Sequence, residues 1–149
     1  MSPRLLAPLV LTAVLAFACG PRSHSSGPTS RKPTSSSVEV ASSLDVRLEK
    51  GVTFAFHVTN SAPKRLELTF PSGQTHDLVV LDEMGREIWR WSDGRMFTQT
   101  LQNQVLERDE TVSYRAEWEP QTLHGRFVAV ASLRSENHPL EQRVHFSLP

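Results

Sequence analysis

Cysteine is almost absent from this chain, because Cys19 is the only one among its 149 residues. No disulfide can therefore form within one molecule, although such bonds are common in exported proteins. A long apolar run is missing too, since the stretch from Leu5 to Ala18 is shorter than the roughly 20 residues of a membrane-spanning helix. Behind the positive charge of Arg4, this stretch instead predicts a signal peptide over residues 1–19.

The end of this signal peptide allows two modes of cleavage. Ala16-Phe17-Ala18 fits the small-x-small pattern of ordinary signal peptidase. The segment 15–20, Leu-Ala-Phe-Ala-Cys-Gly, also resembles a bacterial lipoprotein box in which Cys19 becomes the lipidated first residue. A lone cysteine at this position has a clear use as an acyl acceptor. We therefore expect lipidation at Cys19 and an exported protein of the cell envelope, membrane-anchored on its periplasmic or cell-surface side.

Apolar side chains are missing from residues 20–37, where 14 of the 18 residues are Ser, Thr, Gly or Pro. Such a segment has nothing to bury and cannot offset its chain entropy by folding. The composition therefore predicts a disordered tether over residues 20–37. The folded part is then one domain over residues 38–149.

The folded part also lacks the charge and the motifs of several functional classes. Residues 38–149 hold 12 basic and 16 acidic side chains, a net charge of −4, which argues against a nucleic-acid partner. No glycine-rich phosphate loop is present, and neither a cofactor nor a small-molecule substrate is evident. The histidines show no i, i+2 or i, i+4 pairing, so no metal site is expected.

A hydrolase is also disfavoured. Ser72 lies close to His76 and Asp77 in the sequence, but the chain has no G-x-S-x-G motif. Adjacent residues on a strand point to opposite faces, so His76 and Asp77 would not act together. We therefore expect a protein that is not an enzyme.

Alternation of apolar and polar residues dominates the folded part, and no segment carries a helical stripe. Two runs are nearly continuously apolar, which predicts central strands at Leu78–Leu81 and Phe127–Ala131. Together the runs predict an all-β fold, an immunoglobulin-like antiparallel β-sandwich of about eight or nine strands. A closed barrel is the less favoured alternative. The alternating runs are Leu44–Glu49, Val52–Thr59, Leu66–Phe70, Val112–Trp118 and Val144–Leu148.

Several motifs of the folded part are distinctive. The longest is Gly85–Gln99, which reads GREIWRWSDGRMFTQ, and it is preceded by the FPSGQ of Phe70–Gln74 and the DLVV of Asp77–Val80. Together with the strand around Phe54–Asn60, and with Trp118 and Gly125, these motifs resemble the intracellular proteinase inhibitor family known as BsuPI. The resemblance extends from about Leu44 to Leu148.

This resemblance implies an immunoglobulin-like β-sandwich and inhibition of serine proteases. The chain departs from the family in carrying an export signal, and in reading Arg108-Asp109 at a turn where the family often has Pro-Gly. Two functions therefore stay open. One is a proteinase inhibitor tethered in the cell envelope, and the other is a non-inhibitory envelope lipoprotein that serves as an interaction or assembly module.

The segment from Ser92 to Asn103 is longer than a hairpin requires, and long loops in compact domains tend to be functional or disordered. We expect it to expose Arg95, Met96 and Phe97 in a row, with Arg95 or Met96 entering the specificity pocket of a protease. A competing surface is Pro71–Thr75. The predicted partner-binding residues are Ser92, Asp93, Gly94, Arg95, Met96, Phe97 and Thr98.

Trp89 and Trp91 stand two residues apart, so on a strand they share one face. A core role for both is the simpler interpretation. The alternative is that one of them lies at the sheet edge as a contact residue, because Trp is enriched at interface hot spots.

Overall fold

The computed structural model describes residues 39–149, which form nine antiparallel strands and no helix. The predicted signal peptide, Cys19 and the tether lie outside these residues. No helix long and apolar enough to cross a membrane occurs in the described part. The strands are β1 (Val40–Leu48), β2 (Val52–Asn60), β3 (Leu66–Phe70), β4 (His76–Asp82), β5 (Glu87–Arg90), β6 (Gln102–Leu106), β7 (Thr111–Trp118), β8 (Gly125–Leu133) and β9 (Leu140–Leu148).

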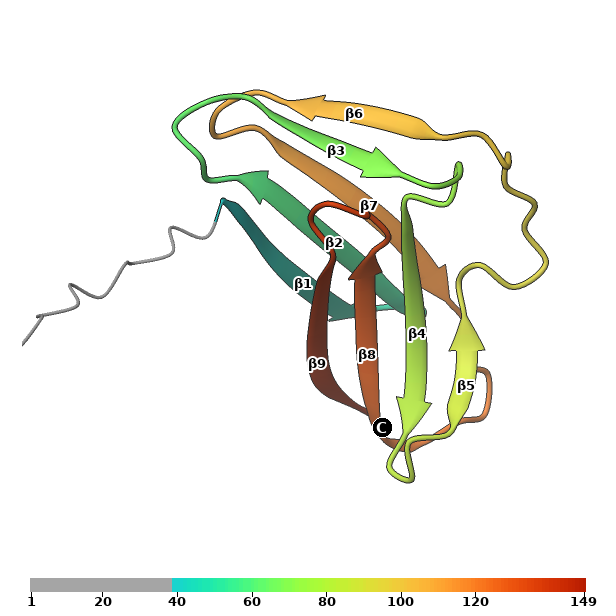
Figure 1. The fold of residues 1–149 in the computed structure, drawn as a ribbon. Helices are drawn as coiled ribbons and strands as arrows, with labels where there is room; N and C mark the ends of the chain where they lie inside the picture. Colours follow the sequence, from blue (N-terminus) through green and yellow to red (C-terminus); the bar gives the residue numbers. More distant parts are fainter. Residues whose placement is uncertain (1–38) are drawn as a thin grey trace, which may run out of the picture. The chain divides into compact units, whose positions relative to one another are not determined.

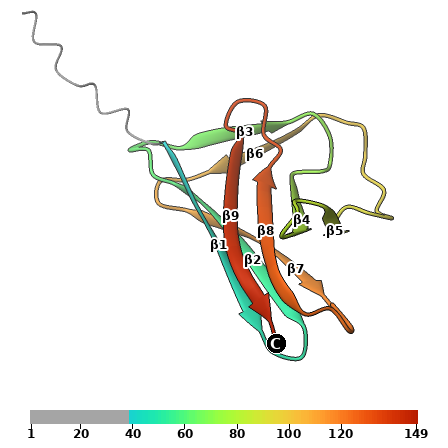
Figure 2. The same ribbon diagram turned by 90° about the horizontal axis from the view of Figure 1, so that it is seen from below.

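The strands form three sheets, of which two pack face to face (Figures 1 and 2). One has the order β1-β2-β7 and the other β5-β4-β8-β9, while β3 and β6 form a separate two-stranded ribbon. Phe54 of β2 stacks on Trp89 of β5 at a centroid distance of 5.9 Å and meets Phe146 of β9 edge-on at 6.0 Å. The predicted all-β fold and antiparallel β-sandwich are confirmed.

The alternation read from the sequence becomes the core of this sandwich. Residues Val52, Phe54, Phe56 and Val58 of β2 are each at most 1% exposed, and the residues between them face outward. Each such side chain contributes about 1.5–3 kcal/mol by leaving water. The described core lies entirely between Val40 and Leu148, so a fragment of residues 38–149 carries its own hydrophobic core.

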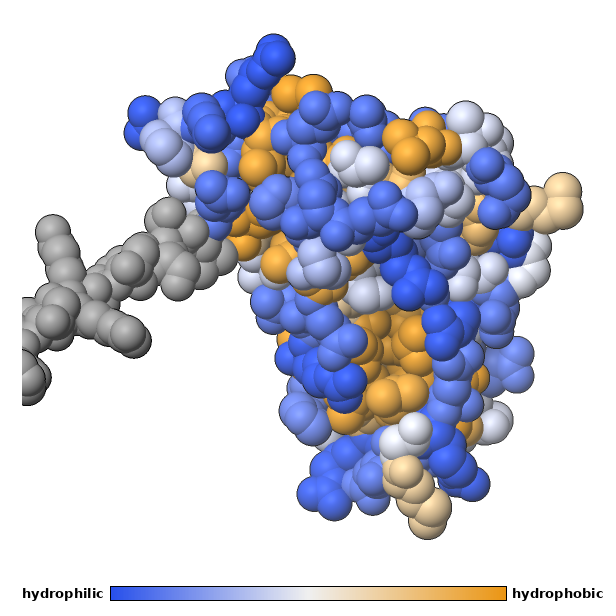
Figure 3. Space-filling view, in the orientation of Figure 1, coloured by the Kyte–Doolittle hydropathy of each residue, from blue (hydrophilic) through white to orange (hydrophobic). Residues whose placement is uncertain are grey.

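The two continuously apolar runs are central strands, as predicted. β4 and β8 pair with each other in the middle of the four-stranded sheet, between β5 and β9. Their inward residues belong to the core, and their outward residues remain half-buried. These outward residues are Val79, Leu81, Val128 and Val130. Figure 3 shows an apolar patch between hydrophilic margins on the face of the molecule drawn there.

The ribbon of β3 and β6 has two different edges. On the edge of β3 that faces away from β6, the Asn137 side chain replaces a neighbouring strand. Its Nδ2 donates to the Glu67 carbonyl (2.7 Å), and its Oδ1 accepts from the Thr69 N–H (3.0 Å). The Glu136 N–H donates to the Thr69 carbonyl (2.8 Å). The β8–β9 loop therefore closes this edge of β3.

Candidate functional site

The loop that connects β5 to β6, residues 91–101, contains the predicted binding residues Ser92–Thr98, and we call it the β5–β6 loop. Its tip is Met96, whose side chain is 97% exposed. A turn precedes the tip, in which the Arg95 N–H donates to the Ser92 carbonyl (3.1 Å). Gly94 occupies the left-handed region of this turn, at φ 72°, which glycine adopts without strain.

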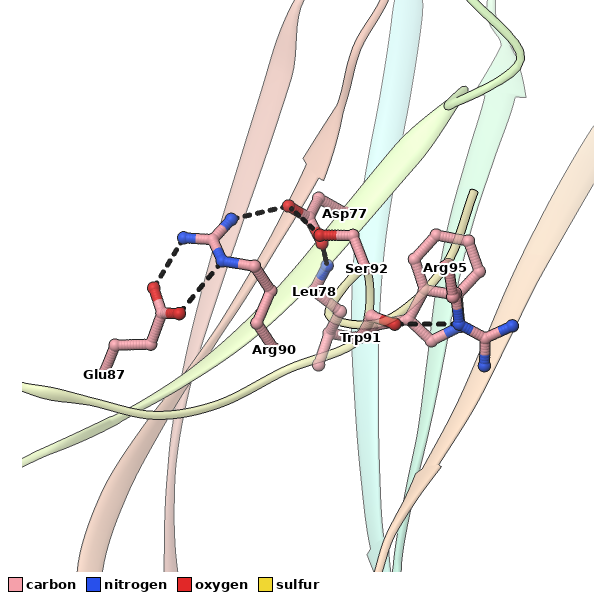
Figure 4. A network of polar contacts seen from close by, with 7 residues as sticks. All are labelled: Asp77, Leu78, Glu87, Arg90, Trp91, Ser92 and Arg95. Atoms are coloured by element: carbon pink, nitrogen blue, oxygen red, sulfur yellow. Dashed lines mark hydrogen bonds and ion pairs between the residues drawn. The ribbon is translucent and has the colours of Figure 1, made fainter. Parts of the chain in front are cut away.

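A buried carboxylate holds the first residues of the loop (Figure 4). Asp77 of β4 is 2% exposed and accepts hydrogen bonds from Arg90 Nη1 (2.6 Å), Ser92 Oγ (3.1 Å) and the Leu78 N–H (2.9 Å). The Arg90 guanidinium also pairs with Glu87, and its hydrogen bonds to Glu87 and then to Asp77 raise the pKa of Arg90 above its usual value. Because a buried charge needs partners, this network fixes where the loop leaves β5.

Aromatic rings hold the next part of the loop, in a series that we call the aromatic stack. Tyr114 of β7 stacks on His76 of β4 at 4.2 Å, and His76 contacts Trp91 at 4.1 Å. Phe97 packs on Trp91 at 5.7 Å from the other end of the loop. Arg95 lies over the Trp91 ring at 4.5 Å, and its Nε donates to the Trp91 carbonyl (2.8 Å). The loop thus folds back on Trp91 from both sides of Met96.

His76 is neutral in this stack. Burial lowers its pKa from the ordinary 6.5 to about 4; Asp77 opposes this shift, and the positive charge of Arg95 adds to it. Its Nε2 is buried and has no hydrogen-bond partner among residues 39–149. His76 and Asp77 contact different partners, as the sequence predicts for adjacent strand residues.

The far end of the loop touches the second candidate surface. The Gly73 N–H donates to the Thr98 carbonyl (2.9 Å), which ties the β3–β4 turn to the β5–β6 loop. A Cβ on Gly73 would lie 2.6 Å from Thr98 Oγ1, so only glycine allows this approach. Pro71–Thr75 and Ser92–Thr98, which the sequence presents as competing surfaces, are therefore neighbours on one surface.

The structure corrects one expectation about the loop. Arg95 and Met96 are exposed as predicted, but Phe97 is half-buried, because its ring packs against Trp91. Trp89 is a core-facing residue, stacked on Phe54 and at 6.1 Å on Trp118. Trp91 packs on the core as well, and the loop folds against its ring.

The sequence did not identify Tyr114 as part of the site, nor did it indicate that His76 and Asp77 hold the β5–β6 loop. Tyr114 lies on a strand far along the chain, and no local pattern connects it to the loop. The one available signal was Asp77 itself, an acidic residue directly before the apolar run of β4. Such a residue must either face solvent or find partners inside.

A second polar group, also missed in the sequence, lies on the outer face of β1-β2-β7. His57 Nδ1 is 2.7 Å from Ser113 Oγ, and His57 Nε2 is 3.4 Å from Asp45 Oδ2. The neighbouring pair Thr59–Thr111 forms the same kind of cross-strand contact at 2.8 Å. The β2 backbone is paired on both sides, so it leaves no N–H free to stabilise an oxyanion beside His57. We therefore assign these residues to cross-strand stabilisation.

Nine antiparallel strands and one long, anchored loop define residues 39–149 as a β-sandwich domain. Within this class, the model of the intracellular proteinase inhibitor family, BsuPI, matches residues 38–138, more than half of the chain. The chain therefore belongs to this family, as its motifs predict. Membership suggests proteinase inhibition, with proteinases as the protein partners.

Two solved structures show weaker likeness, and a search of curated proteins gives no match. The alkylpurine DNA glycosylase AlkC of Pseudomonas fluorescens, bound to DNA with an abasic site analog, is 15% identical with a TM-score of 0.40. The match covers 74% of this chain and 30% of the glycosylase chain, so this chain spans under a third of that protein. The putative ApaA protein of Bordetella pertussis is 16% identical, with a TM-score of 0.39 and coverage of 73% and 89%.

Proposed function

We propose that this domain inhibits a serine protease by placing the β5–β6 loop in the protease cleft, with Met96 in the specificity pocket. The observation that supports this most directly is the contrast within the loop. Met96 is 97% exposed, whereas the residues on either side of it are held against Trp91. An inhibitor needs such a side chain on a segment that is already ordered, because a pre-ordered loop loses little conformational entropy on binding.

The contacts of the two candidate side chains favour Met96 over Arg95. The Arg95 guanidinium stacks on Trp91 and donates to its carbonyl, so it would have to give up both contacts to enter a pocket. Met96 has no such contact to lose. Its apolar, flexible side chain suits a hydrophobic specificity slot of the chymotrypsin kind.

The residues after the tip support binding by strand addition. Residues 97–101 have no secondary structure of their own, yet Thr98 is fixed through Gly73. A backbone held in this way can exchange hydrogen bonds with the cleft of a protease, as an added strand does. Pro71–Thr75 lies beside it and would form part of the same contact surface.

The cell envelope is the proposed location, on the basis of the predicted signal peptide and Cys19. An inhibitor tethered there would act on proteases outside the cytoplasm. The mass of the intact protein extracted from membranes tests the anchor. A mass without a diacylglyceryl group on Cys19 would exclude lipidation.

Inhibition is best tested with the fragment 38–149 against serine proteases of apolar, basic and small-residue specificity. We expect stoichiometric inhibition of an apolar-specific protease, and a loss of about thirtyfold or more on Met96→Asp, the size of an interface hot spot. Met84→Asp is the matched control, because Met84 is a second exposed methionine, at 80%, on the β4–β5 turn. It should leave inhibition unchanged.

Two outcomes would contradict this proposal. If Met96→Asp inhibits as well as the parent fragment, the loop is not the inhibitory segment. If no protease is inhibited, or the fragment is only cleaved slowly, the non-inhibitory envelope interaction module is the better description.

A further inference from the structure

The outer edge of β6 is open in the described part of the chain. Glu67 and Thr69 of β3 direct their backbone groups toward the β8–β9 loop, so the alternate residues of β3 bond to β6. In the β3–β6 register, the β6 residues that share these hydrogen bonds are Gln102, Gln104 and Leu106. Asn103 and Val105 therefore point their N–H and C=O groups away from β3. Neither makes a backbone hydrogen bond on that side within residues 39–149.

The other sheet edges carry features that discourage pairing, and on β7 these are the exposed charges of Arg115 and Glu117. Asn137 covers the edge of β3. β5 is only four residues long, with a pairing irregularity opposite Val80 and Leu81. β1 lies beside β9, with Gln142 Nε2 donating to Ser42 Oγ (3.0 Å).

β6 carries none of these features. The eleven residues from Met96 to Leu106 include no charged residue, no proline and no glycine. Figure 1 shows β6 at the margin of the ribbon, with β3 on its other side. An uncharged, unbroken and uncovered edge is a template for another strand.

The side chains along this edge are symmetric about Asn103. Leu101 and Val105 stand two residues to either side of it and are 59% and 46% exposed. If β6 pairs antiparallel with another β6 so that the two Asn103 residues are opposite, each Leu101 faces Val105 of the second copy. Both exposed apolar side chains are then covered, and no like charges meet, since the strand has none.

We propose that a second copy of this chain adds to β6, giving an isologous dimer with its two-fold axis at Asn103. The ribbon of each copy becomes part of one four-stranded sheet with the order β3-β6-β6-β3. Backbone hydrogen bonds of Asn103 and Val105 and the contact of Leu101 with Val105 hold it together.

Proline substitution distinguishes the two sides of β6. Asn103→Pro removes an N–H that points outward, so it leaves the β3–β6 ladder intact, as proline does at a strand edge. We expect the fragment 38–149 to double its mass in light scattering as its concentration rises. Asn103→Pro should weaken this association about tenfold or more at unchanged melting temperature. Gln104→Pro is the matched control, because it removes an N–H directed at Leu68 and should lower the melting temperature.

Cross-linking tests the register. The fragment 38–149 has no cysteine, so Asn103→Cys introduces a single thiol. Opposed residues of a hydrogen-bonded pair have Cα atoms about 5.5 Å apart, within the range of a disulfide. We expect mild oxidation to convert Asn103→Cys to covalent dimer. Ser43→Cys, exposed on β1 of another sheet, should remain monomeric.

The proposal is overturned if the fragment keeps the mass of one chain at every concentration and Asn103→Cys does not cross-link. It is equally overturned if a dimer forms and Asn103→Pro leaves its affinity unchanged, because another face then makes the contact. These readouts need no protease, so they stand apart from the test of inhibition.

Discussion

Asp77 shows at the scale of one residue how a buried charge positions a loop. Its carboxylate is surrounded by an arginine, a hydroxyl and a backbone N–H; the arginine is the last residue of β5, and the hydroxyl lies at the start of the β5–β6 loop. Removing this carboxylate lowers the stability of the fold, because its hydrogen-bond donors are then left without an acceptor.

Asp77→Ala should lower the free energy of unfolding by about 3 kcal/mol, the size expected when a buried, hydrogen-bonded carboxylate is lost. Urea unfolding of the fragment 38–149 measures this. Glu87→Ala is the control, because Glu87 contacts the same Arg90 from an exposed position and should leave the free energy of unfolding nearly unchanged. Equal losses for the two variants would contradict the central role of Asp77.

His76 makes the same region sensitive to pH. Its pKa is about 4 in the folded protein and 6.5 when unperturbed, so between these values the unfolded chain binds more protons. Stability contributed by neutral His76 is therefore complete above pH 6.5 and declines as the pH falls toward 4.

His76→Phe should remove this part of the pH dependence while keeping a ring between Trp91 and Tyr114. We expect the stability difference between parent and variant to change by on the order of 1–2 kcal/mol between pH 7 and pH 4, allowing for partial exposure. Unfolding curves across this range measure it. A difference that stays constant with pH would show that His76 is not held neutral by the fold.

At the scale of elements, the site depends on the contact of two loops rather than on either alone. The β3–β4 turn approaches the β5–β6 loop closely enough to bond at Gly73 because no Cβ intervenes. Glycine is required here for its small size and not for its backbone conformation, because the φ of Gly73 is not positive.

Gly73→Ala should therefore lower the free energy of unfolding by about 1–2 kcal/mol through crowding against Thr98. Thr98→Ala removes the Oγ1 that the new methyl group meets. In the double variant we expect most of the loss to be recovered, and a double-mutant cycle measures this coupling. Additive effects of the two substitutions would show that the loops are not in contact.

At the scale of the whole molecule, the sequence predicts those features that follow from the pattern of apolar and polar residues along the chain. Alternation located the strands, and the apolar runs identified β4 and β8 as central, because a strand in the middle of a sheet has its outward face partly shielded as well. The same reasoning located the β5–β6 loop as an unusually long connection. These features depend on local order in the sequence, so one sequence is enough to find them.

The contacts within the site could not be predicted, because they join residues from distant strands. Tyr114, His76 and Trp91 come from β7, from β4 and from the residue after β5, and only the packing of the two sheets brings them together. Phe97 was expected to be exposed for a different reason. Its partner Trp91 lies six residues away in the same loop, but the sequence does not indicate that the loop folds back and brings the two rings together.

Because the Asn137 side chain covers the edge of β3, it limits the size of the assemblies that this chain can form. A domain with two open edges can join neighbours at both and form a filament without end. A ribbon with one edge covered by a side-chain amide can pair through its other edge only, and one partner occupies that edge. Because Asn137 covers the edge of β3, assembly through the ribbon would stop at two molecules.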